Sequence, residues 1–199
     1  MKEIFYFGEK VKGYDVRVLN EREARAAAGI LFVMAFFSFM NAFLDKNMFY
    51  IKVFIIIFMT DFIIRLIINP KFSPTLILGR IIVSNQDVEY TGAPQKRFAW
   101  GLGLIMAVSM FLLMYIFKIA TPATLIICII CLTLLFFETA FGICIGCKLY
   151  NLISKNSAQY CPGGVCKIKR KEDIQKISSI QVIILLIFII AVSYLIIFK

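Results

Sequence analysis

Long apolar runs separated by short polar segments dominate the hydrophobic pattern of this chain. A helix rises ~1.5 Å per residue, so about 20 apolar residues are needed to cross the ~30 Å hydrocarbon core of a bilayer. A shorter run, residues 73–83, should lie in the interface or re-enter the membrane. The pattern predicts an all-α membrane protein, a bundle of five transmembrane helices at about residues 26–44, 48–68, 99–117, 122–150 and 177–198.

Polar residues at the ends of the runs indicate where helices start and stop. Asn20 and Glu23 fit a capping box, so we expect the first helix to begin there. Asn69-Pro70 should end the second helix, because proline lacks the N–H that continues the backbone ladder. Trp100, near the start of the third run, is expected to be an interfacial anchor.

Composition and charge agree with a membrane location. The chain is 61% hydrophobic and 17% charged, and it has no histidine, which excludes imidazole ligands and Ser-His chemistry. Most of its 22 lysines and arginines flank one set of loops, so the positive-inside rule places the N-terminus in the cytoplasm and explains the charge without nucleic acid. We divide the chain into a cytoplasmic or interfacial segment (1–25) and a single multi-pass transmembrane domain (26–199), in which 151–176 forms a cytoplasmic cysteine loop.

Six cysteines carry the most distinctive pattern. Cys144-Ile-Gly-Cys147 is a C-x-x-C pair that can form a disulfide or bind a metal. Cys161 and Cys166 are accessory thiols that accept its product, or else complete a four-thiolate zinc or iron–sulfur site with it. Cys128 and Cys131 have the same spacing as the first pair. They lie about 24 Å of helix rise away from it, so we interpret them as packing residues.

Charged residues inside the apolar runs form the second candidate group. Asp61 and Arg65 are one helical turn apart. They could form an ion pair that satisfies itself, or they could belong to a polar pathway. Glu138 lies at a similar depth to Arg65, so the spacing favours an Asp61–Arg65–Glu138 cluster beside the thiol pair. Arg97, ahead of the third run, is included with Asp61 and Arg65 among the substrate-binding or pathway residues.

These residues also carry a family resemblance. The segments are Asp61-x3-Arg65, Lys96-Arg97-Phe98-Ala99 and Glu138-x3-Gly142-x-Cys144-x-Gly146-Cys147-x2-Tyr150. Over about Val18–Ile153 the chain resembles a bacterial integral-membrane family of unknown function, number 4395. The resemblance implies a location in the bacterial cytoplasmic (inner) membrane, a thioredoxin-like or rhodanese-like partner, and the handling of thiol or persulfide sulfur.

The leading expectation is a membrane protein that handles thiol–disulfide or persulfide sulfur at its cytoplasmic face, as an oxidoreductase or a sulfur carrier, without a cofactor. Cys144 and Cys147 would react, and Glu138 would position the substrate or move its proton. One alternative is a small-solute or anion transporter that uses the Asp-Arg-Glu cluster. Another is a thiolate module that binds zinc or iron–sulfur. The sequence leaves the substrate, the direction and the oligomeric state open.

Overall fold

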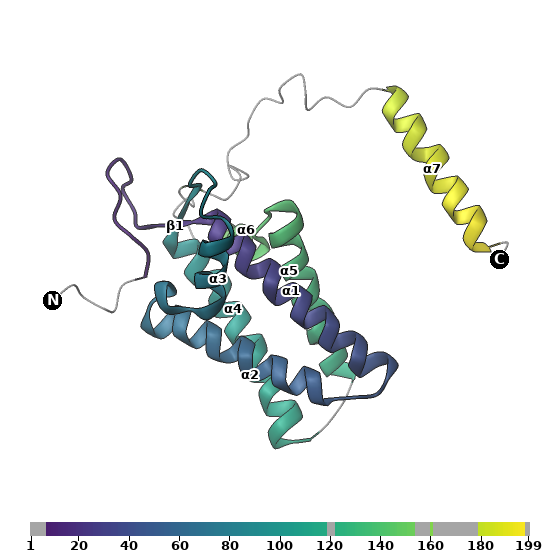
Figure 1. The fold of residues 1–199 in the computed structure, drawn as a ribbon, viewed down its shortest axis with the longest axis horizontal. Coiled ribbons are helices and arrows are strands. Elements are labelled where there is room, and N and C mark those ends of the chain that lie inside the picture. The colour runs from purple at the N-terminus through teal and green to yellow at the C-terminus, as the bar shows by residue number, and fades with distance from the viewer. Residues whose placement is uncertain (1–6, 119–121, 154–159, 161–178, 198–199) are drawn as a thin grey trace. The chain divides into compact units, whose positions relative to one another are not determined.

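A computed structural model describes residues 7–118, 122–153, 160 and 179–197 (Figure 1). The chain divides into two compact units, residues 1–167 and 168–199, and each is described by itself. The second unit contains one helix, α7 (Ser179–Ile197), whose sequence is almost entirely aliphatic. It lies within the predicted fifth run.

The first unit is built on four long helices (Figure 1). They are α1 (Glu21–Leu44), α2 (Phe49–Ile63), α4 (Ala93–Phe111) and α5 (Pro122–Phe141). Helices α2 and α4 continue as single π-helical turns, Ile64–Ile68 and Leu112–Ile116. Helix α1 packs against α2 and α5, and α4 packs against α2. Within the described residues, three helices are long and apolar enough to cross a membrane: Glu21–Leu44, Ala93–Ile116 and Pro122–Phe141. The protein is therefore a mostly helical membrane protein.

The start of α1 confirms the predicted cap. The Asn20 side chain accepts the Arg22 N–H at 3.2 Å and donates to Glu23 Oε1 at 3.1 Å. The Glu23 carboxylate thus bonds to the cap side chain, whereas in a standard capping box it bonds to the cap N–H. The predicted stop is also confirmed, because the π turn ends at Ile68 and Asn69 is extended.

A short antiparallel sheet joins the starts of α1 and α4. Strand β1 (Val18–Asn20) pairs with β2 (Tyr90–Gly92), with Leu19 opposite Thr91. Each strand leads directly into its helix, so the sheet places the first turns of α1 and α4 side by side. Helix α4 begins about six residues before the predicted start at residue 99, because Pro94 occupies the first turn, where proline is tolerated.

The short apolar run folds as α3 (Pro74–Ile82), after the 3-10 turn Pro70–Phe72. It is nine residues long, too short to span a bilayer, as predicted. Ser73 caps it by accepting the Leu76 N–H. Helix α3 packs along α1 so closely that a Cβ on Gly79 would come within 2.7 Å of the Glu23 carbonyl oxygen.

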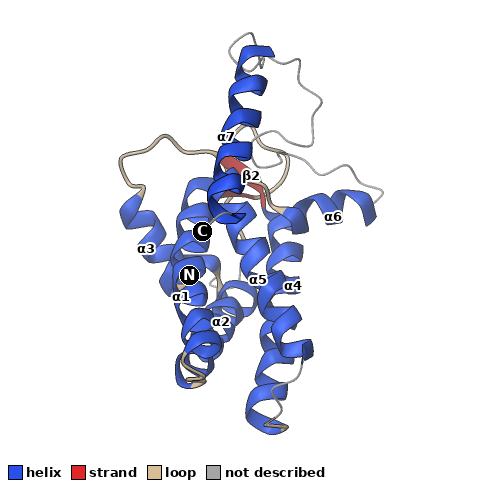
Figure 2. Cartoon of the chain, turned by 90° about the vertical axis from the view of Figure 1, so that its right-hand side faces the viewer, coloured by secondary structure: helices blue, strands red, loops and turns tan. Residues whose placement is uncertain are grey.

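The predicted helix over residues 122–150 is not continuous. Helix α5 ends at Phe141, and α6 (Ile145–Ile153) begins after a break and lies crosswise to α4 and α5 (Figure 2). Gly142 has φ +64°, a left-handed conformation that ends a helix and favours glycine. Because of this break, Cys144 and Cys147 lie at the start of α6, whereas the prediction placed them on the side of one long helix.

The core lies between α1, α2 and α4. It contains Ala27, Leu31, Phe58, Phe62 and Trp100 among its buried members. Trp100 is buried, whereas an interfacial anchor would be exposed to lipid: the residue is 4% exposed and its ring packs edge-on against Phe7, with centroids 5.5 Å apart. Because α4 begins at Ala93, Trp100 falls two turns inside the helix rather than at its end.

Candidate dithiol site

A buried lysine is the centre of the candidate site. The Lys96 side chain is 0% exposed, and its Nζ lies 3.0 and 2.9 Å from the two carboxylate oxygens of Glu21. The same Nζ lies 2.6 Å from Glu138 Oε1. Glu21 is also 0% exposed, whereas Glu138 is 15% exposed. One ammonium group is thus shared between two carboxylates from two other helices.

The fold brings these residues together through the β1–β2 pairing. Glu21 is the first residue of α1 and Lys96 lies in the first turns of α4, directly after the two paired strands. The Glu21 N–H donates to the Glu89 carbonyl at 2.7 Å, which extends the pairing to the helix start. Glu138 arrives from the C-terminal end of α5, which packs against α1.

Arg25 and Glu89 extend the cluster toward the surface. Arg25 Nε lies 3.6 Å from Glu21 Oε1, and Arg25 Nη2 lies 3.4 Å from Glu89 Oε1. Lys96 and Arg25 therefore contact the carboxylates of Glu21, Glu138 and Glu89, and the Glu21 and Glu138 carboxylates, which share Lys96 Nζ, repel each other. A proton arriving at Glu21 or Glu138 would reduce that repulsion.

Glu138 makes its direct ion pair with Lys96 rather than with Arg65, although its charge still acts on Arg65 within the predicted Asp61–Arg65–Glu138 group. Arg65 pairs instead with Asp61, Nε to Oδ2, at 2.7 Å. Ser73 and Thr75 at the start of α3 donate hydroxyl protons to the two Asp61 oxygens at 2.7 and 2.8 Å. The guanidinium also lies over the Trp100 ring, 4.9 Å from its centroid. Asp61 and Arg65 thus form the ion pair that satisfies itself, and their hydrogen bonds with Ser73 and Thr75 join α2 and its π turn to the start of α3.

Arg97 is separate from both groups. It is exposed, and its guanidinium lies 5.7 Å from the centroid of the Phe7 ring. Adjacent helix residues point about 100° apart, so Lys96 turns inward while Arg97 turns outward.

The two predicted thiols lie at the start of α6. Cys144 occupies the N-cap position, and its Sγ accepts the Cys147 N–H at 3.3 Å. A side chain that accepts this N–H satisfies one of the free donors of a helix start. Cys144 is 6% exposed and Cys147 is 1% exposed, and both are free thiols.

Two glycines allow this turn. Gly142 has a positive φ that favours glycine, and a Cβ there would also overlap the Arg25 guanidinium, which would have to move. A Cβ on Gly146 would come within 2.6 Å of Ala99 Cβ, so α6 lies close against α4. The glycines of the sequence motif thus bring the cysteines to the segment of α4 that carries Lys96.

The charges of the cluster act on the thiols. The pKa of the Cys147 thiol is raised, first by its hydrogen bond with Cys144 and then by burial. Lys96 works in the opposite direction and lowers the pKa of Cys147. Cys147 therefore holds its proton, and the lysine is the nearby positive charge that favours losing it.

The remaining cysteines divide into two groups. Cys128 and Cys131 pack against apolar core residues, as expected for packing residues. Cys161 and Cys166, the predicted accessory thiols, lie outside the described residues, so the four-thiolate zinc or iron–sulfur alternative stays a prediction. Among the residues described, no three Cys, Asp or Glu side chains are arranged to hold a metal ion.

Sequence reasoning missed Lys96 and Glu21. Lys96 was counted as a loop residue, although Pro94 after Gly92-Ala93 is a signal for a helix start just before it. With the helix begun at Ala93, Lys96 shares a face with Trp100 and Gly103 at the i, i+4, i+7 spacing. That face is buried.

Comparison with known proteins gives a family and no function. The family model described as "Domain of unknown function (DUF4395)" matches residues 19–155, so the chain belongs to this family, as the resemblance predicted. No curated protein and no solved structure matches the chain.

Proposed function

We propose that this member of the DUF4395 family is a membrane thiol–disulfide exchange protein, with Cys144 and Cys147 as the reacting pair and the Lys96–Glu21–Glu138 cluster as its proton site. The observation that carries the proposal is the position of the pair at the start of α6, with Cys144 Sγ on the Cys147 N–H. A helix start stabilises negative charge, and the thiolate is the reactive form of cysteine.

Cys144 is the attacking residue because it is the more exposed thiol and has the helix N–H as a donor. Its thiolate attacks one sulfur of a substrate disulfide, a Cys144–substrate S–S bond forms, and the substrate S–S bond breaks. The first substrate thiolate leaves with the electron pair and takes a proton from water. This step produces a mixed disulfide.

Cys147 completes the exchange. Its thiol loses a proton to a carboxylate of the cluster, and the thiolate attacks Cys144 Sγ. The second substrate thiol leaves, and the protein now holds a Cys144–Cys147 disulfide. The substrate disulfide has been reduced to two thiols and the protein dithiol has been oxidised. A second dithiol, of the thioredoxin-like class, reverses these steps and restores the starting state.

The cluster suits the proton transfer because two carboxylates share one ammonium group. Lys96 cannot accept a further proton, but Glu138 is a partly exposed carboxylate in direct contact with it. A proton moved from Cys147 to Glu138 or Glu21 stays close to the ammonium and lowers the repulsion between the two carboxylates. The exposed part of Glu138 then provides an exit to water.

The proposed membrane arrangement follows the sequence. We place five spans in the bacterial cytoplasmic membrane, with the N-terminus in the cytoplasm. The cluster and the thiols lie at the end of the bundle where α1 and α4 begin and α5 ends, which is then the cytoplasmic end. Thiols there are kept reduced, as a reaction cycle that starts from the dithiol requires.

The test is redox equilibration. Purified protein is incubated in glutathione buffers from reducing to oxidising, quenched in acid and alkylated, and the Cys144–Cys147 disulfide is measured by peptide mass spectrometry. We expect a reversible transition that is abolished in Cys144→Ser and retained in the matched control Cys128→Ser. Glu138→Gln should slow disulfide formation with little change in the midpoint. A pair that stays as two thiols in every buffer refutes the proposal.

A further inference from the structure

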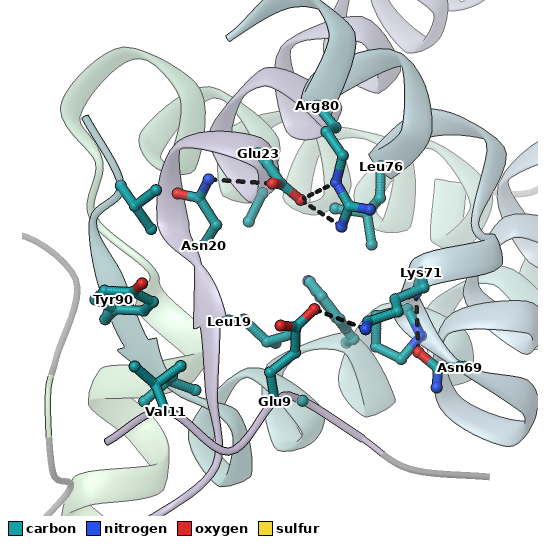
Figure 3. A pocket seen from close by; sticks show the side chains of 16 residues that line it. Glu9, Val11, Leu19, Asn20, Glu23, Asn69, Lys71, Leu76, Arg80 and Tyr90 are labelled. Carbon is teal, nitrogen blue, oxygen red and sulfur yellow. Dashed lines mark hydrogen bonds and ion pairs between the residues drawn. The ribbon is translucent and has the colours of Figure 1, made fainter. Parts of the chain in front are cut away.

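A cavity of about 300 Å³ lies between the N-terminal segment, the start of α1 and the start of α3 (Figure 3). Two ion pairs lie on opposite sides of it. On one side Lys71 Nζ lies 2.9 Å from Glu9 Oε1, and on the other Arg80 Nη2 lies 3.0 Å from Glu23 Oε2. Both cations are about half exposed, so they can turn toward a ligand without unfolding the protein.

The charges in the wall are balanced. Two cations and two carboxylates leave no net charge among these four groups, so they do not favour a simple anion. A ligand that carries both a phosphate and an ammonium group adds no net charge and gives each wall residue a partner of opposite sign. The pKa of Arg80 is raised by its hydrogen bonds with Glu23, so its charge is present at any physiological pH.

The floor and the surroundings of the cavity are apolar. Leu19, Ala24, Leu76 and Trp100 line it. Helix α3, which supplies Arg80, exposes four large aliphatic side chains: Ile77, Leu78, Ile81 and Ile82. Helix α1 is of membrane-spanning length and begins at Glu21, so the proposed membrane arrangement places the cavity at the depth where lipid head groups meet the acyl chains. The exposed face of α3 is placed to contact those chains.

We infer that this cavity binds the head group of an amine-bearing phospholipid, a phosphoethanolamine ester. The phosphate lies between Lys71 and Arg80, and the primary ammonium group donates to Glu9 and Glu23. A primary amine provides three donors for carboxylates, whereas a choline head group provides none and a glycerol head group has no positive charge. The acyl chains run along α3. This site is separate from the thiols and independent of their proposed chemistry.

Trp100 supplies a direct readout, because it lines the cavity and is the single tryptophan of the chain. Detergent-purified full-length protein is titrated with short-chain phosphatidylethanolamine, phosphatidylglycerol and phosphatidylcholine, and with soluble phosphoethanolamine, while tryptophan emission is recorded. We expect a saturable change that is tightest for phosphatidylethanolamine. Lys71→Gln and Arg80→Gln should each weaken it about tenfold, as expected for a lost hydrogen bond between charged groups.

Two further variants decide the chemistry. Glu9→Gln removes one of the two ammonium partners, so it should reduce the preference for phosphatidylethanolamine over phosphatidylglycerol. Arg97→Gln removes an exposed cation that does not line the cavity, and it should bind as the parent does. Three lipids with equal affinity would overturn the proposal, and so would parental binding in Lys71→Gln and Arg80→Gln. Soluble phosphoethanolamine that binds as tightly as the lipid would assign the cavity to a small solute and overturn the lipid assignment.

Discussion

Replacement of Lys96 by methionine tests whether the cluster is an energetic centre of the fold. Methionine has nearly the same volume and removes only the ammonium group, which contacts three carboxylate oxygens within 3.0 Å. Glu21 would be left 0% exposed, with Arg25 Nε at 3.6 Å as its nearest remaining cation. Breaking a buried ion pair from one side costs about 3–5 kcal/mol. That is a large part of a typical domain stability of ~5–15 kcal/mol.

The measurement is the unfolding free energy in detergent, with tertiary structure followed by Trp100 emission. Glu21→Gln combined with Lys96→Met should recover part of the loss, because the buried charge is gone. Arg97→Gln is the matched control, since it removes the next side chain, which is exposed, and should stay within about 0.5 kcal/mol of the parent. A Lys96→Met protein that is as stable as this control would refute the reasoning.

Three further predictions concern the turn, the thiols and α3. Gly142→Ala should lower stability by more than Gly13→Ala in a thermal melt, because both have positive φ but only Gly142 lacks space for a Cβ; equal losses would contradict the contact. The alkylation rate of Cys147 should still rise above about pH 9, and Cys144→Ala should shift the profile to lower pH by removing the bond that raises the pKa of Cys147. An unshifted profile would exclude that bond. Ser73→Ala should cost about 1–2 kcal/mol on unfolding, because it removes a cap and an Asp61 donor; no loss would mean that water replaces the hydroxyl.

Local sequence signals were sufficient for much of the fold. The apolar runs located α1 and α2, Asn20 and Glu23 located the start of α1, and Asn69-Pro70 located the end of the second run. These features depend on neighbours within a few residues. The burial of Trp100 does not, because it depends on where α4 begins and on which residues of α2 and α3 pack against it.

Only the part of the candidate site that depends on local sequence, the thiol pair, was predicted. The C-x-x-C spacing identified Cys144 and Cys147 as a pair. It did not show that α5 ends at Phe141, which places the pair at the start of α6. In an apolar run Gly142 reads as one more small residue of a membrane helix, and nothing local requires its positive φ. A second constraint on this position is Arg25, more than a hundred residues earlier, whose guanidinium occupies the space of a Cβ. Likewise, the similar depths of Arg65 and Glu138 along their helices did not predict their ion-pair partners, which are Asp61 and Lys96.

The two buried ion groups differ in how completely they are satisfied, and this separates structure from chemistry. Both Asp61 oxygens accept hydrogen bonds, from Arg65, from the hydroxyls of Ser73 and Thr75 and from the Thr75 N–H, so the buried carboxylate is fully paired. In the Lys96 cluster, by contrast, Glu138 is partly exposed and two carboxylates share one ammonium group. Asp61→Asn should therefore lower stability and leave the redox midpoint of the thiol pair unchanged. A shifted midpoint would show that the pair senses the Asp61–Arg65 charges and would place the proton site in the wrong group.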